Sequence, residues 1–225
     1  MSGRRSQTAA TVKLLKIISG GQTGVDRAAL DVALRHGIEC GGWCPTGRLD
    51  EFGKIPDHYP VRELKQGNKE GRSLDRPGGL ETDIFAKRTL ANVWDSNGTI
   101  IIYCDNLRGG TAYTVECCKH LQRPHQLIDA SKVATEDAAK LIADFVHESK
   151  IGILNVAGPR QSEWPEGYDW TFHVLDAFVK SIMIPNNTDA RDSHRAADVG
   201  GEFLRFFGKS VLREIAAEQQ HVCAP

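Results

Sequence analysis

The architecture of the chain follows from one segment, Leu14-Leu-Lys-Ile-Ile-Ser-Gly-Gly-Gln-Thr-Gly-Val-Asp-Arg-Ala-Ala-Leu-Asp31. Its apolar beginning, Leu14 to Ile18, predicts a buried strand. Two glycines follow the strand, and small or apolar residues recur at helical spacing from Val25 onward. The segment therefore predicts the strand, tight turn and helix that form the first half of a βαβ unit.

The turn within this segment has the features of an anion-binding site. Gly20 and Gly21 allow positive φ and a close approach of the backbone to a ligand. The helix that follows points unpaired N–H groups and the positive end of its dipole at the same place. The alternative is a capping box of Thr23 and Asp26, which needs no ligand, but the third glycine, Gly24, favours anion binding. No Gly-Lys-Ser/Thr follows, so the turn is not a P-loop, and G-x-G-x-x-G is absent too.

Bulk properties narrow the class of protein. The chain of 225 residues is long enough for one domain and an appendage, and its net charge of -1 argues against general affinity for nucleic acid. No run of 18 or more apolar residues predicts a membrane span. Residues 1–11 read as a disordered lead-in without the apolar core of a secretory signal. None of the six cysteines forms a C-x-x-C pair, so we expect reduced thiols in the cytoplasm and no bound metal.

Strands and helices alternate along the rest of the domain. Further strands are predicted at 38–43, 99–103, 124–129 and 152–157. One helix is predicted from about residue 82 and a second after Gly109-Gly110-Thr111, ending at residue 121. Two more are predicted at 135–148 and at 170–183. This order predicts an α/β fold with about five parallel strands and helices on both faces of the sheet. We expect this domain to span residues 12–184.

Several strand ends carry residues suited to ligand binding, and ligands in such sheets bind beyond the carboxyl ends of the strands. Trp43 could stack on a flat ring and Arg48 could hold an anion; equally, Trp43 could be core and Arg48 a solvated charge. Gly109-Gly110-Thr111 repeats the opening design, with Thr111 as a helix cap. Gly158 and Arg160 follow the last strand.

Two segments stand apart from this pattern. Residues 66–79 are polar and rich in glycine, and we expect a mobile insertion there, after a more ordered cover over residues 55–61. Residues 185–225 read as a linker and an amphipathic helix with an apolar stripe. That helix could pack on the domain, join a partner subunit or form a loosely held tail, and we expect a homo-oligomer.

Five motifs in order resemble the molybdenum cofactor carrier family, which is the circularly permuted YpsA-like branch of the SLOG superfamily of Rossmann-like proteins. The motifs are Gly20 to Asp31, Gly42-Trp-Cys-Pro-Thr-Gly-Arg48, Arg88-Thr-x-x-Asn92-x-x-Asp95-Ser96, Gly109-Gly-Thr-Ala112 and Leu154-Asn-Val-Ala-Gly-Pro-Arg-Gln-Ser-Glu163. The resemblance implies a Rossmann-like three-layer fold that binds molybdenum cofactor (molybdopterin) or another nucleotide-like, phosphorylated ligand. Mapped on this chain, the ligand-binding residues would be Gly20, Gly21, Gln22, Thr23, Gly24, Asp26, Arg27, Trp43, Arg48, Arg88, Asn92, Gly109, Gly110, Thr111, Gly158 and Arg160.

Asp26 complicates a phosphate site, because a carboxylate repels phosphate unless Mg²⁺ or a ribose hydroxyl lies between them. The sequence shows no nucleophile–base pair or metal cage, which favours a carrier over an enzyme.

The alternative is a nucleotide N-glycosidase, a nucleoside monophosphate phosphoribohydrolase. SLOG enzymes of the cytokinin-activating type carry Gly-Gly-x-x-x-x-x-Glu, and Gly109, Gly110 and Glu116 keep that spacing. Glu116 would then act near the ribose and Arg88 on the phosphate, although Ala112 and Tyr113 depart from the motif. A partner-binding module built on the C-terminal helix is a third hypothesis.

Overall fold

The computed structural model describes residues 14–64 and 84–183. The lead-in predicted at 1–11, the insertion at 66–79 and the extension at 185–225 lie outside the described residues. Within the described part of the chain, no helix combines the length and the apolar character needed to cross a membrane.

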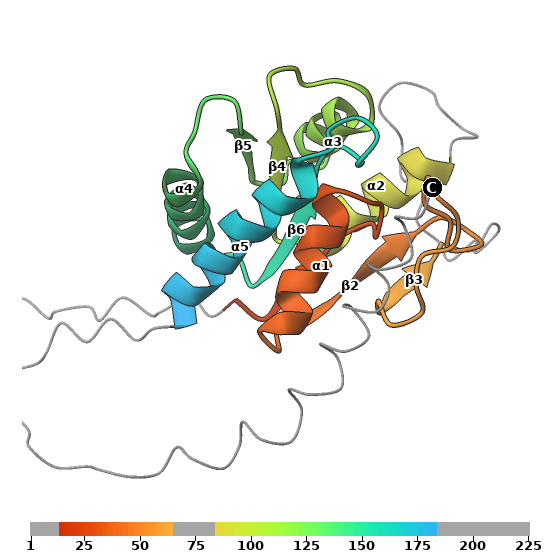
Figure 1. Ribbon diagram of the computed structural model, residues 1–225, viewed down its shortest axis with the longest axis horizontal. Helices are drawn as coiled ribbons and strands as arrows, with labels where there is room; N and C mark the ends of the chain where they lie inside the picture. The colour runs from red at the N-terminus through yellow and green to blue at the C-terminus, as the bar shows by residue number, and fades with distance from the viewer. Residues whose placement is uncertain (1–13, 65–83, 184–225) are drawn as a thin grey trace, which may run out of the picture. The chain divides into compact units, whose positions relative to one another are not determined.

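The described residues form one parallel sheet (Figure 1). Its strands are β1 (Lys16–Ile18), β2 (Glu39–Cys44), β3 (Val61–Glu63), β4 (Gly98–Tyr103), β5 (His125–Asp129) and β6 (Ile153–Ala157). They lie in the order β3-β2-β1-β6-β4-β5, and every pairing is parallel. The predicted α/β fold is therefore confirmed.

The sheet has six strands where about five were predicted. The additional strand is β3, a three-residue edge strand in which only Val61 is buried while Arg62 and Glu63 are exposed. A strand this short gives no periodic pattern in the sequence. Ile55 and Tyr59, which precede it, are also buried and anchor the segment to the core.

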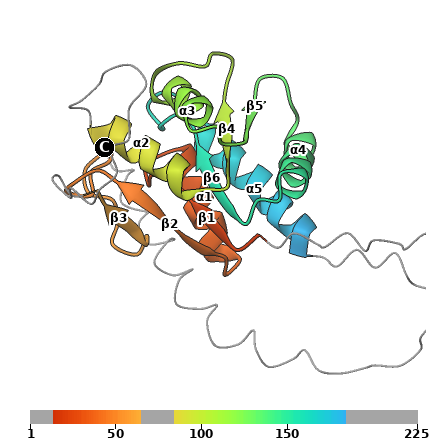
Figure 2. The same cartoon turned by 180° about the vertical axis from the view of Figure 1, so that it is seen from behind.

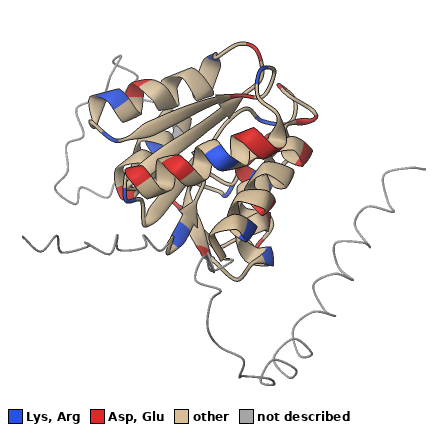
Figure 3. Cartoon of the chain, turned by 90° about the vertical axis from the view of Figure 1, so that its left-hand side faces the viewer, with Lys and Arg blue, Asp and Glu red and all other residues tan. Residues whose placement is uncertain are grey.

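Five helices cover the two faces of the sheet. They are α1 (Val25–Arg35), α2 (Ile84–Asp95), α3 (Gly109–His120), α4 (Thr135–Glu148) and α5 (Gly167–Met183). α5 packs against α1 and α4 on one face, and α2 packs against α3 on the other (Figures 1 and 2). The result is the three-layer arrangement that the family resemblance implied. On the side shown in Figure 3, acidic and basic residues are interspersed along the helices.

The interior strand β4 shows why both faces must be covered. Ile100 and Ile102 belong to the core under α1, α4 and α5, whereas Ile101 packs with Leu90 and Val93 of α2 on the other side. Successive strand residues point to opposite faces, so a continuous apolar run requires two helical layers.

Neither helix cap that the sequence offered is present: not the Thr23–Asp26 capping box, which was the alternative to an anion site, and not the cap at Thr111. The N-cap of α1 is Gly24, which makes no side-chain cap bond, and Thr23 instead directs its hydroxyl to Glu51. At α3 the N-cap is Arg108, so Thr111 lies inside the first turn rather than before it. At the start of α1, the backbone N–H of Val25 donates instead to Pro159 O at 3.3 Å.

Candidate functional site

The carboxyl ends of β1, β6 and β4 are neighbours in the sheet, and the loops that follow them line one cavity. Its volume is about 280 Å³. α2 and α3 complete its wall. The predicted residues that line it are Gly20, Gln22, Asp26, Arg88, Asn92, Gly109, Gly110, Thr111, Gly158 and Arg160. The two Gly-Gly turns recognised in the sequence therefore meet at a single site.

Gly20 accommodates a buried ion pair in the cavity wall. Arg88 Nη1 lies 2.8 Å from Asp26 Oδ2, and the two side chains are only 15% and 4% exposed. A Cβ on Gly20 would lie 1.3 Å from Arg88 Nη1 and 2.8 Å from Asp26 Oδ2. The absence of a side chain at Gly20 is thus what lets this pair form against the backbone.

The same pair changes the electrostatics expected for Asp26. Its Oδ2 accepts from Arg88 and also from the backbone N–H of Gln22 at 3.3 Å. The carboxylate is therefore compensated by the protein itself, without the Mg²⁺ or hydroxyl that the sequence suggested. Arg88 Nε is buried and has no hydrogen-bond partner within the described ranges.

The first turn of α3 forms the part of the cavity best suited to an anion. The first backbone bond into this helix runs from Ala112 N to Arg108 O. The N–H groups of Gly109, Gly110 and Thr111 precede that bond and lie at the positive end of the helix dipole. A Cβ built on Gly110 meets nothing within 4 Å, so the turn is open.

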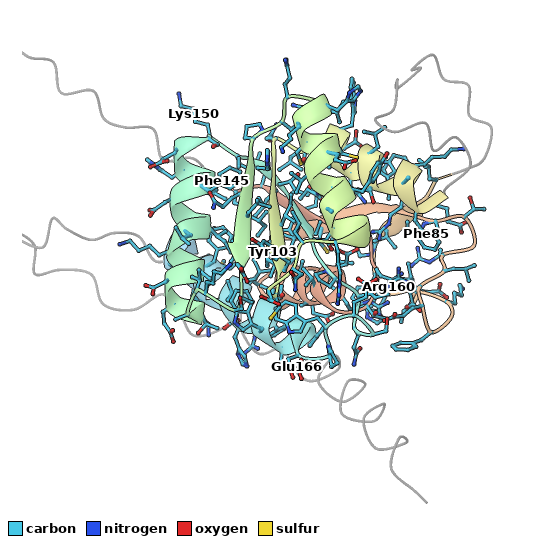
Figure 4. The ribbon with its side chains drawn as sticks, turned by 90° about the horizontal axis from the view of Figure 1, so that it is seen from above. Phe85, Tyr103, Phe145, Lys150, Arg160 and Glu166 are labelled. Atoms are coloured by element: carbon cyan, nitrogen blue, oxygen red, sulfur yellow. The ribbon has the colours of Figure 1, made fainter. Side chains whose placement is uncertain are left out.

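Arg160 adds a positive charge to the same cavity. Its side chain is 45% exposed, and its Nε lies 3.1 Å from Glu163 Oε1. Figure 4 labels Arg160 and Phe85, two of the lining residues, in the view from above. Arg160 extends from the loop after β6 and Phe85 from α2.

Three predicted residues of the first turn shape the site without lining the cavity. Gly21 and Gly24 both have φ of 73°, and a Cβ on Gly24 would lie 2.7 Å from Pro159 O. Thr23 donates its hydroxyl to Glu51 and accepts from Gln161 N at 3.1 Å. These contacts lock the turn after β1 against the loop after β6.

Glu51 extends that connection to a third loop. It accepts from the hydroxyls of Thr23 and Ser162 and from Ser162 N, while its own N–H donates to Gln22 Oε1 at 3.0 Å. Burial would raise the pKa of Glu51, but the hydrogen bonds from Ser162 and Thr23 outweigh it and hold the pKa below its ordinary value. Glu51 was not predicted as a site residue, because its partners lie far away in the sequence.

Arg27 and Arg48 lie outside the lining of this cavity and donate hydrogen bonds to backbone carbonyl oxygens instead. Arg27 donates to Gly21 O at 3.1 Å and to Asp50 Oδ2 at 2.7 Å, with its guanidinium over the ring of Tyr59. Arg48 donates to three carbonyl oxygens, of Val61, Pro56 and Tyr59. Arg48 is therefore neither placed for the predicted anion contact nor merely solvated.

The side chain of Asn92 makes two hydrogen bonds to the backbone of Trp43. The Asn92 side chain accepts from Trp43 N at 2.8 Å and donates to Trp43 O at 3.0 Å. The indole Nε1 of Trp43 donates to Asp95 at 2.7 Å, and Arg62 stacks over the ring. Trp43 is thus half-buried and paired, outside the lining of the cavity, so neither predicted role fits it. Arg88, Asn92 and Asp95 do share one helix face, as their spacing predicted.

Glu116, the alternative catalytic residue, is exposed on α3 and is not among the residues that line the cavity. The α3 side chains that do line it are those of Thr111, Tyr113 and Thr114. Carboxylates reach the cavity from elsewhere, at Asp26 and Glu163.

Some lining residues were missed in the sequence. Phe85 and Thr89 lie three residues before and one residue after Arg88 on α2, so the face of that helix could have indicated Phe85. Asn155 is a buried polar residue inside an apolar strand, which is itself a signal of a special role. Glu163 carried no signal beyond its place in the last motif.

The buried cysteines are not poised for reaction or metal binding. Burial raises the pKa of Cys117 to about 12 and that of Cys118 to about 11, so both remain protonated thiols. Across residues 14–64 and 84–183, no group of three or more His, Cys, Asp or Glu side chains could hold a metal ion.

The fold and the site define the class of protein: a Rossmann-like α/β protein with a cavity beyond the carboxyl ends of a parallel sheet. A family model described as the circularly permuted YpsA SLOG family matches residues 17–179. The chain belongs to that family.

A solved structure supports the same assignment. The chain is 41% identical to a protein from Syntrophus aciditrophicus SB described as a "Putative molybdenum carrier protein", with a TM-score of 0.65. The match covers 74% of this chain and 95% of that one. No curated protein matches the chain.

Proposed function

We propose that this protein is a carrier that binds molybdenum cofactor or a related nucleotide-like, phosphorylated ligand in the cavity beyond β1, β6 and β4. The observation that carries the proposal is the meeting of the two Gly-Gly turns in one cavity beside the open first turn of α3. The description of the 41% identical protein as a molybdenum carrier supports the choice of ligand.

The residues present fit a phosphorylated group. The N–H groups of Gly109, Gly110 and Thr111 would bind phosphate oxygens, as at other helix N-termini. Arg160 would add a cation at the rim. The buried Nε of Arg88, which has no partner among the described residues, would donate to the ligand.

The geometry gives no specific support to the N-glycosidase alternative. Its proposed carboxylate, Glu116, is exposed and outside the lining of the cavity. The carboxylates that do line the cavity are each paired with an arginine, Asp26 with Arg88 and Glu163 with Arg160. Such paired groups suit binding and positioning rather than attack on a sugar bond.

The test compares two substitutions at one position. Gly110→Glu places a negative charge in the open turn, whereas Gly110→Ala adds only a methyl group to a helix, where space is free. Native mass spectrometry of the purified proteins should find a phosphorylated pterin or nucleotide on the wild type and the Ala variant, and none on the Glu variant.

Two results would contradict the proposal. One is a wild-type protein that carries no phosphorylated compound and binds neither nucleoside monophosphates nor inorganic phosphate. The other is release of a free base from a nucleoside monophosphate by the wild-type protein, which would establish the N-glycosidase instead.

A further inference from the structure

The cavity has a hydrogen-bond acceptor that phosphate binding leaves unused. Asp26 is 3% exposed and lines the cavity. Its Oδ2 accepts from Arg88 and Gln22, whereas no described residue donates to Oδ1. Asn155 also lines the cavity, and its amide donates to Thr99, so its side-chain oxygen is a second acceptor on this side.

A carboxylate oxygen accepts hydrogen bonds and cannot donate them. It offers no hydrogen bond to a phosphate oxygen and binds N–H groups instead. With its two lone-pair positions, Oδ1 of Asp26 can accept from two adjacent N–H donors. This side of the cavity is therefore complementary to a part of the ligand other than its phosphate.

The topology separates the acceptor side from the donor side. Asp26 follows β1 and Gly110 follows β4, with β6 between these two strands. Two strand spacings amount to about 10 Å. That span suits a molecule with a flat ring at one end and a phosphate at the other.

We infer that Asp26 is a specificity-determining residue, which binds the N–H edge of a 2-amino-4-oxopyrimidine ring of the kind shared by guanine and pterin. The ring lies at the Gly20 side, and the phosphate lies at the first turn of α3. Adenine fits less well, because it offers a ring-nitrogen acceptor where guanine offers N–H. This inference rests on the proposed function, since it assigns the ring end of the same ligand.

The experiment is isothermal titration calorimetry on the full chain with guanosine, inosine and adenosine 5′-monophosphates and with inorganic phosphate. Inosine keeps the ring N–H but lacks the 2-amino group, so the affinities should fall in the order guanosine, inosine, adenosine. Guanosine monophosphate should bind at least about tenfold more tightly than adenosine monophosphate, a typical effect of hydrogen bonds to a charged acceptor.

Two variants identify the residue responsible. Asp26→Asn should bring the guanosine and adenosine affinities within about twofold of each other, without weakening inorganic phosphate. Glu163→Gln removes the other lining carboxylate and should keep the preference. Thermal unfolding checks that each variant is folded. If Asp26→Asn is not folded, the order of the wild-type affinities still tests the inference.

The outcomes separate the inference from the proposed function. Equal affinity of the wild type for guanosine and adenosine monophosphates, together with binding of inorganic phosphate, would overturn the inference alone. Equal weakening of both nucleotides in Asp26→Asn would also overturn it, because Asp26 would then bind the ribose. Failure of every phosphorylated probe to bind would remove the proposed function as well.

Discussion

At the scale of the residue, the site depends on the absence of a side chain at Gly20. The guanidinium of Arg88 lies where the Cβ of any other residue at position 20 would be. This contact fixes the arginine beside Asp26 and thereby sets the charge of the cavity wall. A glycine that the sequence suggested for binding phosphate is needed here for packing against an arginine.

Gly20→Ala should lower the free energy of unfolding by about 3 kcal/mol, because the methyl group displaces Arg88 and leaves the buried carboxylate of Asp26 without its partner. Chemical denaturation checks the value. Gly110→Ala is the matched control, and it should be neutral or slightly stabilising, since its methyl group enters open space in a helix. Equal stability of the two variants would show that the contact over Gly20 has no energetic weight.

The sequence predicted which turns line the cavity better than it predicted what each side chain does. Gly20, Gly110 and Arg88 were identified because glycines after strands and arginines in motifs are visible locally. The actual partners of Arg48 and Trp43 were not, because their contacts are with backbone carbonyls and with a helix far along the chain. Such pairings depend on the folded topology, which no local pattern contains.

At the scale of the element, three loops are joined to one another beside the cavity. Glu51, from the segment after β2, accepts from Thr23 after β1 and from Ser162 after β6. Gln22 joins the same network through the backbone of Glu51. The carboxylate of Glu51 therefore fixes the positions of these loops relative to one another.

This network makes stability depend on pH in a definite direction. Because the pKa of Glu51 is lowered in the folded protein, its contribution is fully present above the unfolded value of about 4.3 and is lost as the pH falls through the folded value. Glu51→Gln should be less stable than the wild type at pH 7, and the difference should shrink at pH 3. Urea denaturation at the two pH values measures it, and a constant difference would show that the carboxylate charge is not involved.

At the scale of the whole molecule, the order of the strands creates the site. β6 is the last strand among the described residues, yet it lies between β1 and β4. Its loop therefore contributes Gly158 and Arg160 between the two Gly-Gly turns. The sequence predicted the strands and their common direction, but not this order, because no local signal tells where a late strand inserts.

The expected homo-oligomer and cytoplasmic location remain predictions. The hypothesis of a partner-binding C-terminal helix concerns residues 185–225, which lie beyond the part of the chain that the structure describes. The account of the cavity does not depend on them.

The central claim is that separate strand ends bind one ligand together, and backbone amide NMR shifts during titration with guanosine 5′-monophosphate test it most directly. The amides of Gly20, Gly110 and Gly158 should shift with a single common dissociation constant, while those of Gly37 and Gly152, away from the cavity lining, should stay fixed. Shifts at Gly20 and Gly110 with different dissociation constants, or no shift at either, would contradict the account.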